Sequence, residues 1–344
     1  MIIDITGFGW SGSGAIIDLL SEYDDVQVLK GIELSLLYNV DGVKDLEYKL
    51  LEKHSRVFDS DVAIKRFLHL VESQYKIDKK IVNLARNYIK SLVGIEFYSR
   101  SIYDRIYFPS YKYQLSGVYN FLIKKTIGNK YIGPKVGKRI VNSLKIHNRN
   151  KKYLSYNPCS FIDETHIFLS QLLELFNDGS NRPYVTDHLF PPDDPRPYFN
   201  YFVDGIKCII VRRDPRDTYI LAKEIYKSAI PIPVDTINDF VWFYKNTIED
   251  QYVSDSTEIL NIKFEDLIYN YDVTIKRIES FLNIYQHNRV KQIFDPDISI
   301  NNTRLFKRFD KYKDDIAFIE EKLKESLYPF DDRSNLKCSN YKVF

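Results

Sequence analysis

Residues 1–23 read MIIDITGFGWSGSGAIIDLLSEY, and this stretch decides the fold. The apolar run 1–7 ends at Gly7 and predicts a buried strand, while apolar residues recur at helical spacing from Ser13 onward. A turn rich in glycine and serine joins the strand to the helix. Such a turn points backbone N–H groups and the positive end of the helix dipole at one place. The stretch therefore predicts a binding site for a phosphate-like anion.

Apolar segments that predict further strands recur along the chain, at 25–30, 182–190, 206–215 and 257–267. The last three are each followed by helical periodicity, and alternating strands and helices imply a parallel sheet covered on both faces. The region from about 45 to 175 is mostly helical in pattern. We therefore expect an α/β protein with a P-loop-like three-layer fold, a central parallel sheet and a large helical insertion.

A single domain over residues 1–330 is the simplest organisation, followed by a polar tail at 331–344. The insertion at about 45–175 is expected to cover the carboxyl ends of the strands, where ligands of α/β folds bind. The 49 Lys and Arg residues nearly balance the 47 Asp and Glu residues, so no global field favours nucleic acid. The 27 tyrosines tilt the prediction slightly toward a sugar or nucleotide ligand.

The cysteines and histidines indicate no metal or disulfide framework. Cys159, Cys208 and Cys338 are odd in number and widely spaced, which fits a reducing compartment. The six histidines show no paired ligand spacing, so we expect no metal. The first residues lack the pattern of a signal peptide, and no stretch is long and apolar enough to span a membrane. A cytoplasmic protein is expected.

The loop at 7–14 departs from the pattern of nucleoside-triphosphate sites. The motif GxxxxGK[ST], laid on these residues, puts Ser13 at the lysine and Gly14 at the hydroxyl that binds the metal ion. Because both groups are missing, the sequence opposes an ATP or GTP site of this kind. The identity of the anion must therefore be inferred from other segments of the sequence.

Three later segments supply a resemblance: VRRDPRDTYI (211–220), NIKFEDLIYNYDVTIKRIESFLNI (261–284) and TRLFKRFDKYKDDIAFIEEKLKESLYPF (303–330). Together with the first loop, in this order, they resemble the sulfotransferase family, which uses 3′-phosphoadenosine 5′-phosphosulfate (PAPS) as sulfuryl donor and releases adenosine 3′,5′-bisphosphate. The resemblance leaves the helical middle of the chain unmatched. It implies that the loop holds the 5′-phosphosulfate.

The resemblance also implies further contacts to the donor. Arg213 matches the arginine that holds the 3′-phosphate, and a guanidinium at a strand end suits bidentate bonds to phosphate. The alternative for this arginine is an ion pair with a neighbouring aspartate. Arg304 falls near the family's C-terminal nucleotide-contacting segment. The residues expected to bind the donor are Gly9, Trp10, Ser11, Gly12, Ser13, Gly14, Arg213 and Arg304.

Two positions depart from the family's pattern. Trp10 stands where the family's loop carries a Lys or Arg that stabilises charge on the oxygen bridging sulfuryl group and nucleotide, and Leu221 stands at a family serine. Loss of such a charge-stabilising group removes about 3 kcal/mol of transition-state stabilisation if nothing replaces it. Lys30 is the first candidate for the missing cation. Trp10 itself is expected to pack, or to stack on a ligand ring.

Two residues compete as the base that removes the acceptor's proton. His188 in VTDHLFP resembles the histidine base of cytosolic sulfotransferases, although Thr186 replaces the lysine of that segment. Glu33 in VLKGIELSLLY resembles the glutamate base of glycosaminoglycan sulfotransferases. The plainer alternatives are a structural hydrogen bond for His188 and a helix N-terminal carboxylate for Glu33. The sequence does not choose between the two bases.

Residues 124–152 carry ten Lys or Arg and no Asp or Glu. A solvated basic face is the plainer explanation. The functional one is attraction of the anionic donor, of an acceptor on a diphosphate lipid, or of a membrane surface in peripheral contact. RNA binding is a third option, for which the single tyrosine-led interruption YIG supplies little stacking surface.

We therefore expect a sulfotransferase that moves a sulfuryl group from PAPS to a hydroxyl, on a carbohydrate or a surface-glycan precursor. The alternatives are a P-loop ATP-dependent kinase and a sulfotransferase-like protein that binds nucleotide or glycan with little or no catalysis. Trp10 and Leu221 favour the last of these.

Overall fold

The structure is a computed structural model that describes residues 1–53, 58–75, 78–109, 111–127, 140–145, 149–203, 205–227, 232–288 and 293–330. Its contacts divide the chain into two compact units. One unit combines 1–39 with 169–344, and the other consists of 40–168. The expected single domain over 1–330 stays a prediction. The expected polar tail lies outside the described residues.

The first unit is built on a five-stranded sheet with the order β2-β5-β1-β6-β7, and every pairing in it is parallel. Its strands are β1 (Ile2–Gly7), β2 (Gln27–Glu33), β5 (Tyr184–Asp187), β6 (Ile206–Arg212) and β7 (Ile259–Lys263). The five strands expected from the sequence are all present, and the α/β prediction with a central parallel sheet is confirmed.

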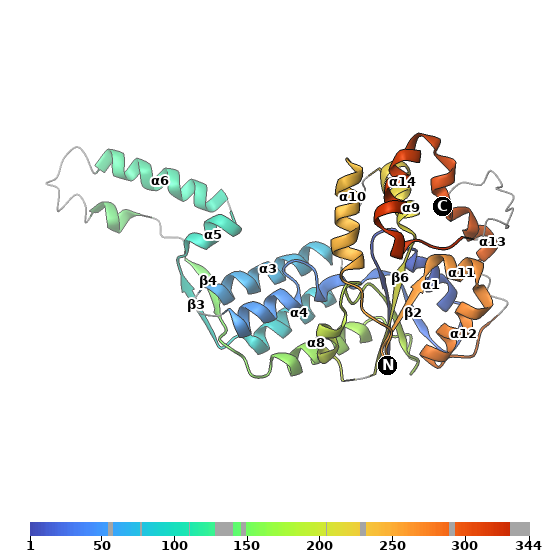
Figure 1. Ribbon diagram of the computed structural model, residues 1–344. Coiled ribbons are helices and arrows are strands. Elements are labelled where there is room, and N and C mark those ends of the chain that lie inside the picture. Colours follow the sequence, from blue (N-terminus) through green and yellow to red (C-terminus); the bar gives the residue numbers. More distant parts are fainter. Residues whose placement is uncertain are drawn as a thin grey trace. The chain divides into compact units, whose positions relative to one another are not determined.

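The helices of this unit flank the sheet (Figure 1). They are α1 (Ser13–Leu20), α9 (Pro215–Ile220), α10 (Ile237–Tyr244), α11 (Phe264–Tyr269), α12 (Tyr271–Leu282), α13 (Pro296–Ser299) and α14 (Lys313–Lys322). The last of these helices, α14, ends at Lys322.

Two apolar clusters hold these helices. Ile3 and Ile5 on β1 pack with Ile16 and Leu19 on α1, and α11 and α12 join the same cluster. The second cluster joins α9, α10 and α14, with Phe240 and Ile319 fully buried in it. All six residues of β1 are buried, as expected for a central parallel strand covered on both faces.

The second unit contains most of the residues expected to form a helical insertion. Its helices are α2 (Val43–Glu47), α3 (Asp59–Gln74), α4 (Lys79–Leu92), α5 (Ile102–Tyr107) and α6 (Tyr111–Ile127), and α8 (Phe161–Glu174) begins in it. Two antiparallel strands, β3 (Ile95–Ser99) and β4 (Asn150–Leu154), also lie there. This pair was not predicted from the sequence. Much of the basic stretch 124–152 lies outside the described residues.

A search of the described helices found none with the length and apolar character needed to cross a bilayer.

Candidate functional site

The candidate residues follow from where the parallel strands end. Glu33 is the last residue of β2, Asp187 of β5 and Gly7 of β1. Strand β6 ends at Arg212, directly before Arg213. Since β5 and β6 flank β1, these ends meet at one edge of the sheet, beside the glycine loop. Ligands of open α/β sheets bind at this edge, where the strand order reverses.

A cavity of about 770 Å³ lies at this edge. The predicted residues that line it are Gly9, Trp10, Ser11, Gly12, Ser13, Gly14, Glu33, His188 and Arg213. Leu221 lines it as well, at the position where the family has serine. Arg304 is not among the described residues that line it; its guanidinium lies over the Phe330 ring, 4.9 Å from the ring centroid. Lys30 belongs to β2, but its side chain lies outside the part of the chain that the structure describes.

The loop owes its shape to two residues in the left-handed region. Trp10 has φ 65° and Gly12 has φ 90°. A Cβ on Gly12 would lie 2.4 Å from a ring carbon of Phe264, so only glycine fits there. The amide of Ser11 donates to the carbonyl of Phe8 at 2.9 Å, which closes the turn before α1 begins. Ser13 and Gly14 open α1 and line the cavity, and amides at a helix N-terminus have no carbonyl four residues earlier to bond.

Several buried polar atoms near the loop have no hydrogen-bond partner among the described residues. They are the hydroxyl of Ser11, Nε1 of Trp10, Nε of Arg213 and Oδ1 of Asn302. Buried polar groups are nearly always paired, so unpaired ones that line a cavity point to a ligand. Three of these four groups are donors, which suits an anion.

Trp10 packs against a neighbouring aromatic ring. Its indole stacks on Tyr226 with ring centroids 3.7 Å apart and planes 5° from parallel. The indole also packs against the cluster of α9, α10 and α14. One face of the indole is therefore covered within the fold, as the packing role expected for Trp10 requires.

Arg213 braces the loop. Its Nη1 donates to the carbonyl of Trp10 at 3.2 Å and its Nη2 donates to the carbonyl of Asn302. Its guanidinium lies over the Phe264 ring, 4.7 Å from the centroid. Its role in holding the 3′-phosphate stays a prediction, and its Nε, which has no partner among the described residues, is the donor left for such a contact.

The ion pair proposed as an alternative for this arginine is made by its neighbour in the motif. Arg216 bonds the carboxylate of Asp214 at 2.7 Å and that of Glu320 at 2.7 Å. The buried carboxylate of Glu265 accepts the amide of Asp214 at 2.9 Å, which ties the end of β7 to the turn after β6. Burial raises the pKa of Glu265 to about 8, and the charge of Asp214 adds to the shift.

His188 sits in the left-handed region with φ 55°, directly after β5. Its Nδ1 lies 2.6 Å from Oδ1 of Asp187, and its Nε2 lies 3.0 Å from the carbonyl of Gly7. Burial disfavours the charged ring, but the hydrogen bond and charge of Asp187 and the carbonyl of Gly7 outweigh it. They raise the pKa of His188 to about 9.

Two side chains of β1 hold the backbone on which His188 sits. The Asp4 carboxylate accepts the amide of Leu189 at 2.9 Å and that of Phe190 at 3.0 Å, and the hydroxyl of Thr6 donates to the carbonyl of Phe190. Burial raises the pKa of Asp4 to about 6 against the effect of these bonds. Asp4 is fully buried, so its carboxylate serves this turn.

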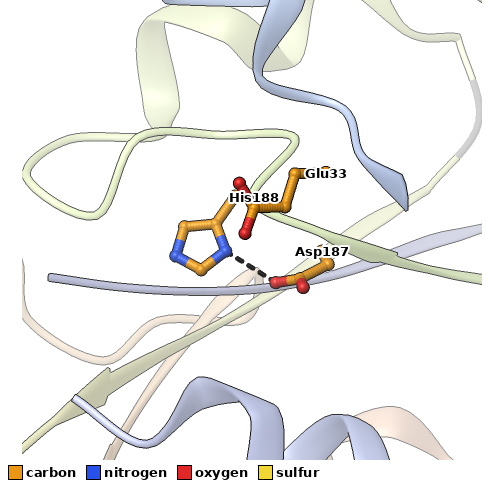
Figure 2. A group of neighbouring side chains, drawn as sticks. All are labelled: Glu33, Asp187 and His188. Atoms are coloured by element: carbon orange, nitrogen blue, oxygen red, sulfur yellow. Dashed lines mark hydrogen bonds and ion pairs between the residues drawn. The ribbon is translucent and has the colours of Figure 1, made fainter. Parts of the chain in front are cut away.

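Glu33 pairs with Asp187 in the sheet register, and its carboxylate faces the imidazole of His188 (Figure 2). One donor atom from each of Glu33, Asp187 and His188 lies within 4.8 Å of the others, a spacing that an ion could bridge. Both ring nitrogens of His188 face oxygen acceptors, however, and a ring that donates at both nitrogens has no lone pair for an ion. The group therefore fits a hydrogen-bonded charge cluster better than a metal centre.

Sequence reasoning missed several residues that form the site. Asp187 and Asp4 had weak signals: Asp187 directly precedes His188, and Asp4 is a lone charge inside an apolar strand. The segment at 293–302 lines the cavity with Phe294 and Asn302, and no motif marks it.

No protein-family model matches the chain, and no curated protein matches it. Among solved structures it is similar to the sulfotransferase domain of the Synechococcus PCC 7002 olefin synthase, with 12% identity and a TM-score of 0.36 over 82% of this chain and 73% of that one. It is also similar to the sulfotransferase domain from the curacin biosynthetic pathway, with 14% identity and a TM-score of 0.40 over 95% and 98% of the two chains. Neither description mentions a carbohydrate acceptor, and likenesses of this size carry no argument about the reaction.

Proposed function

We propose that this protein transfers a sulfuryl group from PAPS to an acceptor hydroxyl. The observation that carries the proposal is one cavity at which an anion-binding loop, unpaired donors and a carboxylate meet. The loop supplies the first turn of α1 and the hydroxyl of Ser11, and Glu33 faces the same space.

The residues present fit a nucleotide of this kind. The cavity of about 770 Å³ lies within the range of small-molecule sites, about 300–1,000 Å³. The loop amides and Ser11 would hold the 5′-phosphosulfate. Phe8, Phe294 and Ile298 give part of the wall an apolar surface suited to a purine. The resemblance at Glu33 favours a carbohydrate hydroxyl as acceptor.

The transfer needs alignment, charge neutralisation and one proton acceptor. The acceptor oxygen forms a bond to sulfur while the bond from sulfur to the bridging oxygen breaks. The electron pair of the broken bond stays on the nucleotide as adenosine 3′,5′-bisphosphate. The hydroxyl proton passes to a base, for which Glu33 and His188 are the candidates at the cavity wall. Donors at the loop stabilise the charge that develops on the leaving phosphate.

Transfer of labelled sulfate from PAPS to mixed glycans tests whether the protein is an enzyme. We expect transfer by the native chain and a loss of at least about 100-fold in Glu33→Gln, which keeps the size of the side chain and removes the base. Glu96→Gln, in the other unit, serves as the matched control and keeps full activity. Full activity in Glu33→Gln rejects Glu33 as the base. If the native chain transfers sulfate to none of the glycans, the proposal of an enzyme is rejected in favour of a binding protein.

A kinase of similar architecture is the second candidate, and thermal unfolding separates it from the first. A ligand present at 100 times its dissociation constant stabilises the fold by about 2.7 kcal/mol. We expect this stabilisation from adenosine 3′,5′-bisphosphate without metal. Stabilisation by magnesium-ATP alone would reject the sulfotransferase proposal in favour of the kinase.

A further inference from the structure

The loop of this protein lacks a cation, and the structure indicates where positive charge enters the cavity. Gly7 through Gly14 contain no Lys or Arg. Among the described residues that line the cavity, His188 and Arg213 are the basic ones. The guanidinium of Arg213 donates to the carbonyls of Trp10 and Asn302, and its Nε has no partner among the described residues.

His188 has acceptors at both ring nitrogens. The carboxylate of Asp187 cannot donate when ionised, and the carbonyl of Gly7 never can. A neutral imidazole carries one proton and would therefore place a lone pair against one of these oxygens. Only the imidazolium donates at both contacts, at 2.6 and 3.0 Å.

The groups packed around the ring agree with this charge. Asp187 on β5, Asp4 on β1 and Glu33 at the end of β2 are all acidic. Burial raises the pKa of the Tyr38 hydroxyl, and the charges of these three carboxylates raise it further. Tyr38 therefore stays neutral. The backbone cannot easily release the ring, because Asp4 holds the two amides that follow His188.

We propose that His188 is held as an imidazolium and supplies the positive charge that the loop lacks at Trp10, while Glu33 accepts the proton of the acceptor hydroxyl. The inference rests on the proposed function for the step that it serves. His188 bonds the carbonyl of Gly7, where the loop begins, so the ring lies at the base of the loop that is proposed to hold the donor. A ring that already carries two protons takes up no third, which removes His188 as a base.

Nitrogen NMR on protein labelled at histidine reads this charge without any donor or acceptor. His188→Asn assigns the signal among the six histidines, and asparagine tolerates the left-handed backbone. We expect both ring nitrogens of His188 to carry protons at pH 7.5. Asp187→Asn should shift the titration of His188 toward the ordinary range, while Asp193→Asn, an exposed carboxylate on the same segment, leaves it in place. A single protonated nitrogen at pH 7.5 overturns the inference.

The pH profile of sulfuryl transfer distinguishes a cation from a base. A cationic His188 predicts activity that falls above about pH 9, whereas a histidine base predicts activity that rises as the ring loses its proton. We also expect His188→Lys to retain at least tenfold more kcat than His188→Asn, because lysine restores a charge. If transfer occurs and either result is reversed, the inference fails and the proposed function stands. If no transfer occurs while both nitrogens are protonated, the proposed function fails instead.

Discussion

Asp187 directly precedes His188 in the chain, and its Oδ1 lies 2.6 Å from Nδ1 of the histidine ring. Adjacent residues of a strand normally point to opposite faces of the sheet. Here the strand ends at Asp187 and the left-handed φ of His188 brings the ring back beside the carboxylate. The pair therefore depends on the turn, and the turn depends on Asp4.

The pair makes stability depend on pH. The pKa of His188 rises from 6.5 to about 9 on folding, so its stabilisation is fully present below pH 6.5 and is lost as pH rises through 9. Between pH 6 and 9.5 we expect the free energy of unfolding of the native chain to fall by roughly 3 kcal/mol more than that of His188→Asn. Urea unfolding of both proteins across this range measures it. Equal slopes for the two proteins would show that the ring is not held in its charged form.

Two glycines of the loop should respond in opposite ways to alanine. Gly12→Ala places a Cβ 2.4 Å from the Phe264 ring at φ 90°, and we expect a loss of roughly 3 kcal/mol. A Cβ at Gly14 meets nothing within 4 Å and lies in α1, where alanine gains about 0.5–1 kcal/mol over glycine. The urea midpoints of both variants test this loop geometry. A similar loss of stability in the two variants would contradict it.

The turn that carries His188 should weaken in steps when β1 is changed. Asp4→Asn keeps one acceptor oxygen and turns its NH₂ toward the amide of either Leu189 or Phe190, so we expect a loss of roughly 2 kcal/mol. Thr6→Val removes only the bond to the carbonyl of Phe190 and should cost about 1 kcal/mol. Calorimetric melting at pH 7.5 measures both. An Asp4→Asn protein as stable as the native chain would mean that the carboxylate does not hold the turn.

The sheet was predictable from the sequence because each of its strands is an apolar run between helical patterns. The pair β3 and β4 was not. Its residues Ile95 and Tyr98 are exposed, so no apolar alternation marks the strands, and they pair across a long intervening segment. Long-range pairing without a buried face leaves little local signal.

The meeting of the loop, Glu33 and His188 was also predictable, since the carboxyl ends of parallel strands share one edge. The protonation state of His188 was not predictable, because it depends on the carbonyl of Gly7 and on a left-handed turn. The bonds of Arg213 to two carbonyls were equally hidden, since backbone acceptors have no sequence signal.

Calorimetric titration with adenosine 3′,5′-bisphosphate, without metal, tests most directly whether the loop holds a sulfated nucleotide. We expect one site on the native chain and about 10- to 100-fold weaker binding in Ser11→Ala, because the buried hydroxyl loses a bond to a charged group. Ser21→Ala, at the far end of α1, should bind like the native chain. The account is contradicted if the native chain binds no bisphosphate, or if Ser11→Ala binds it as tightly as Ser21→Ala does.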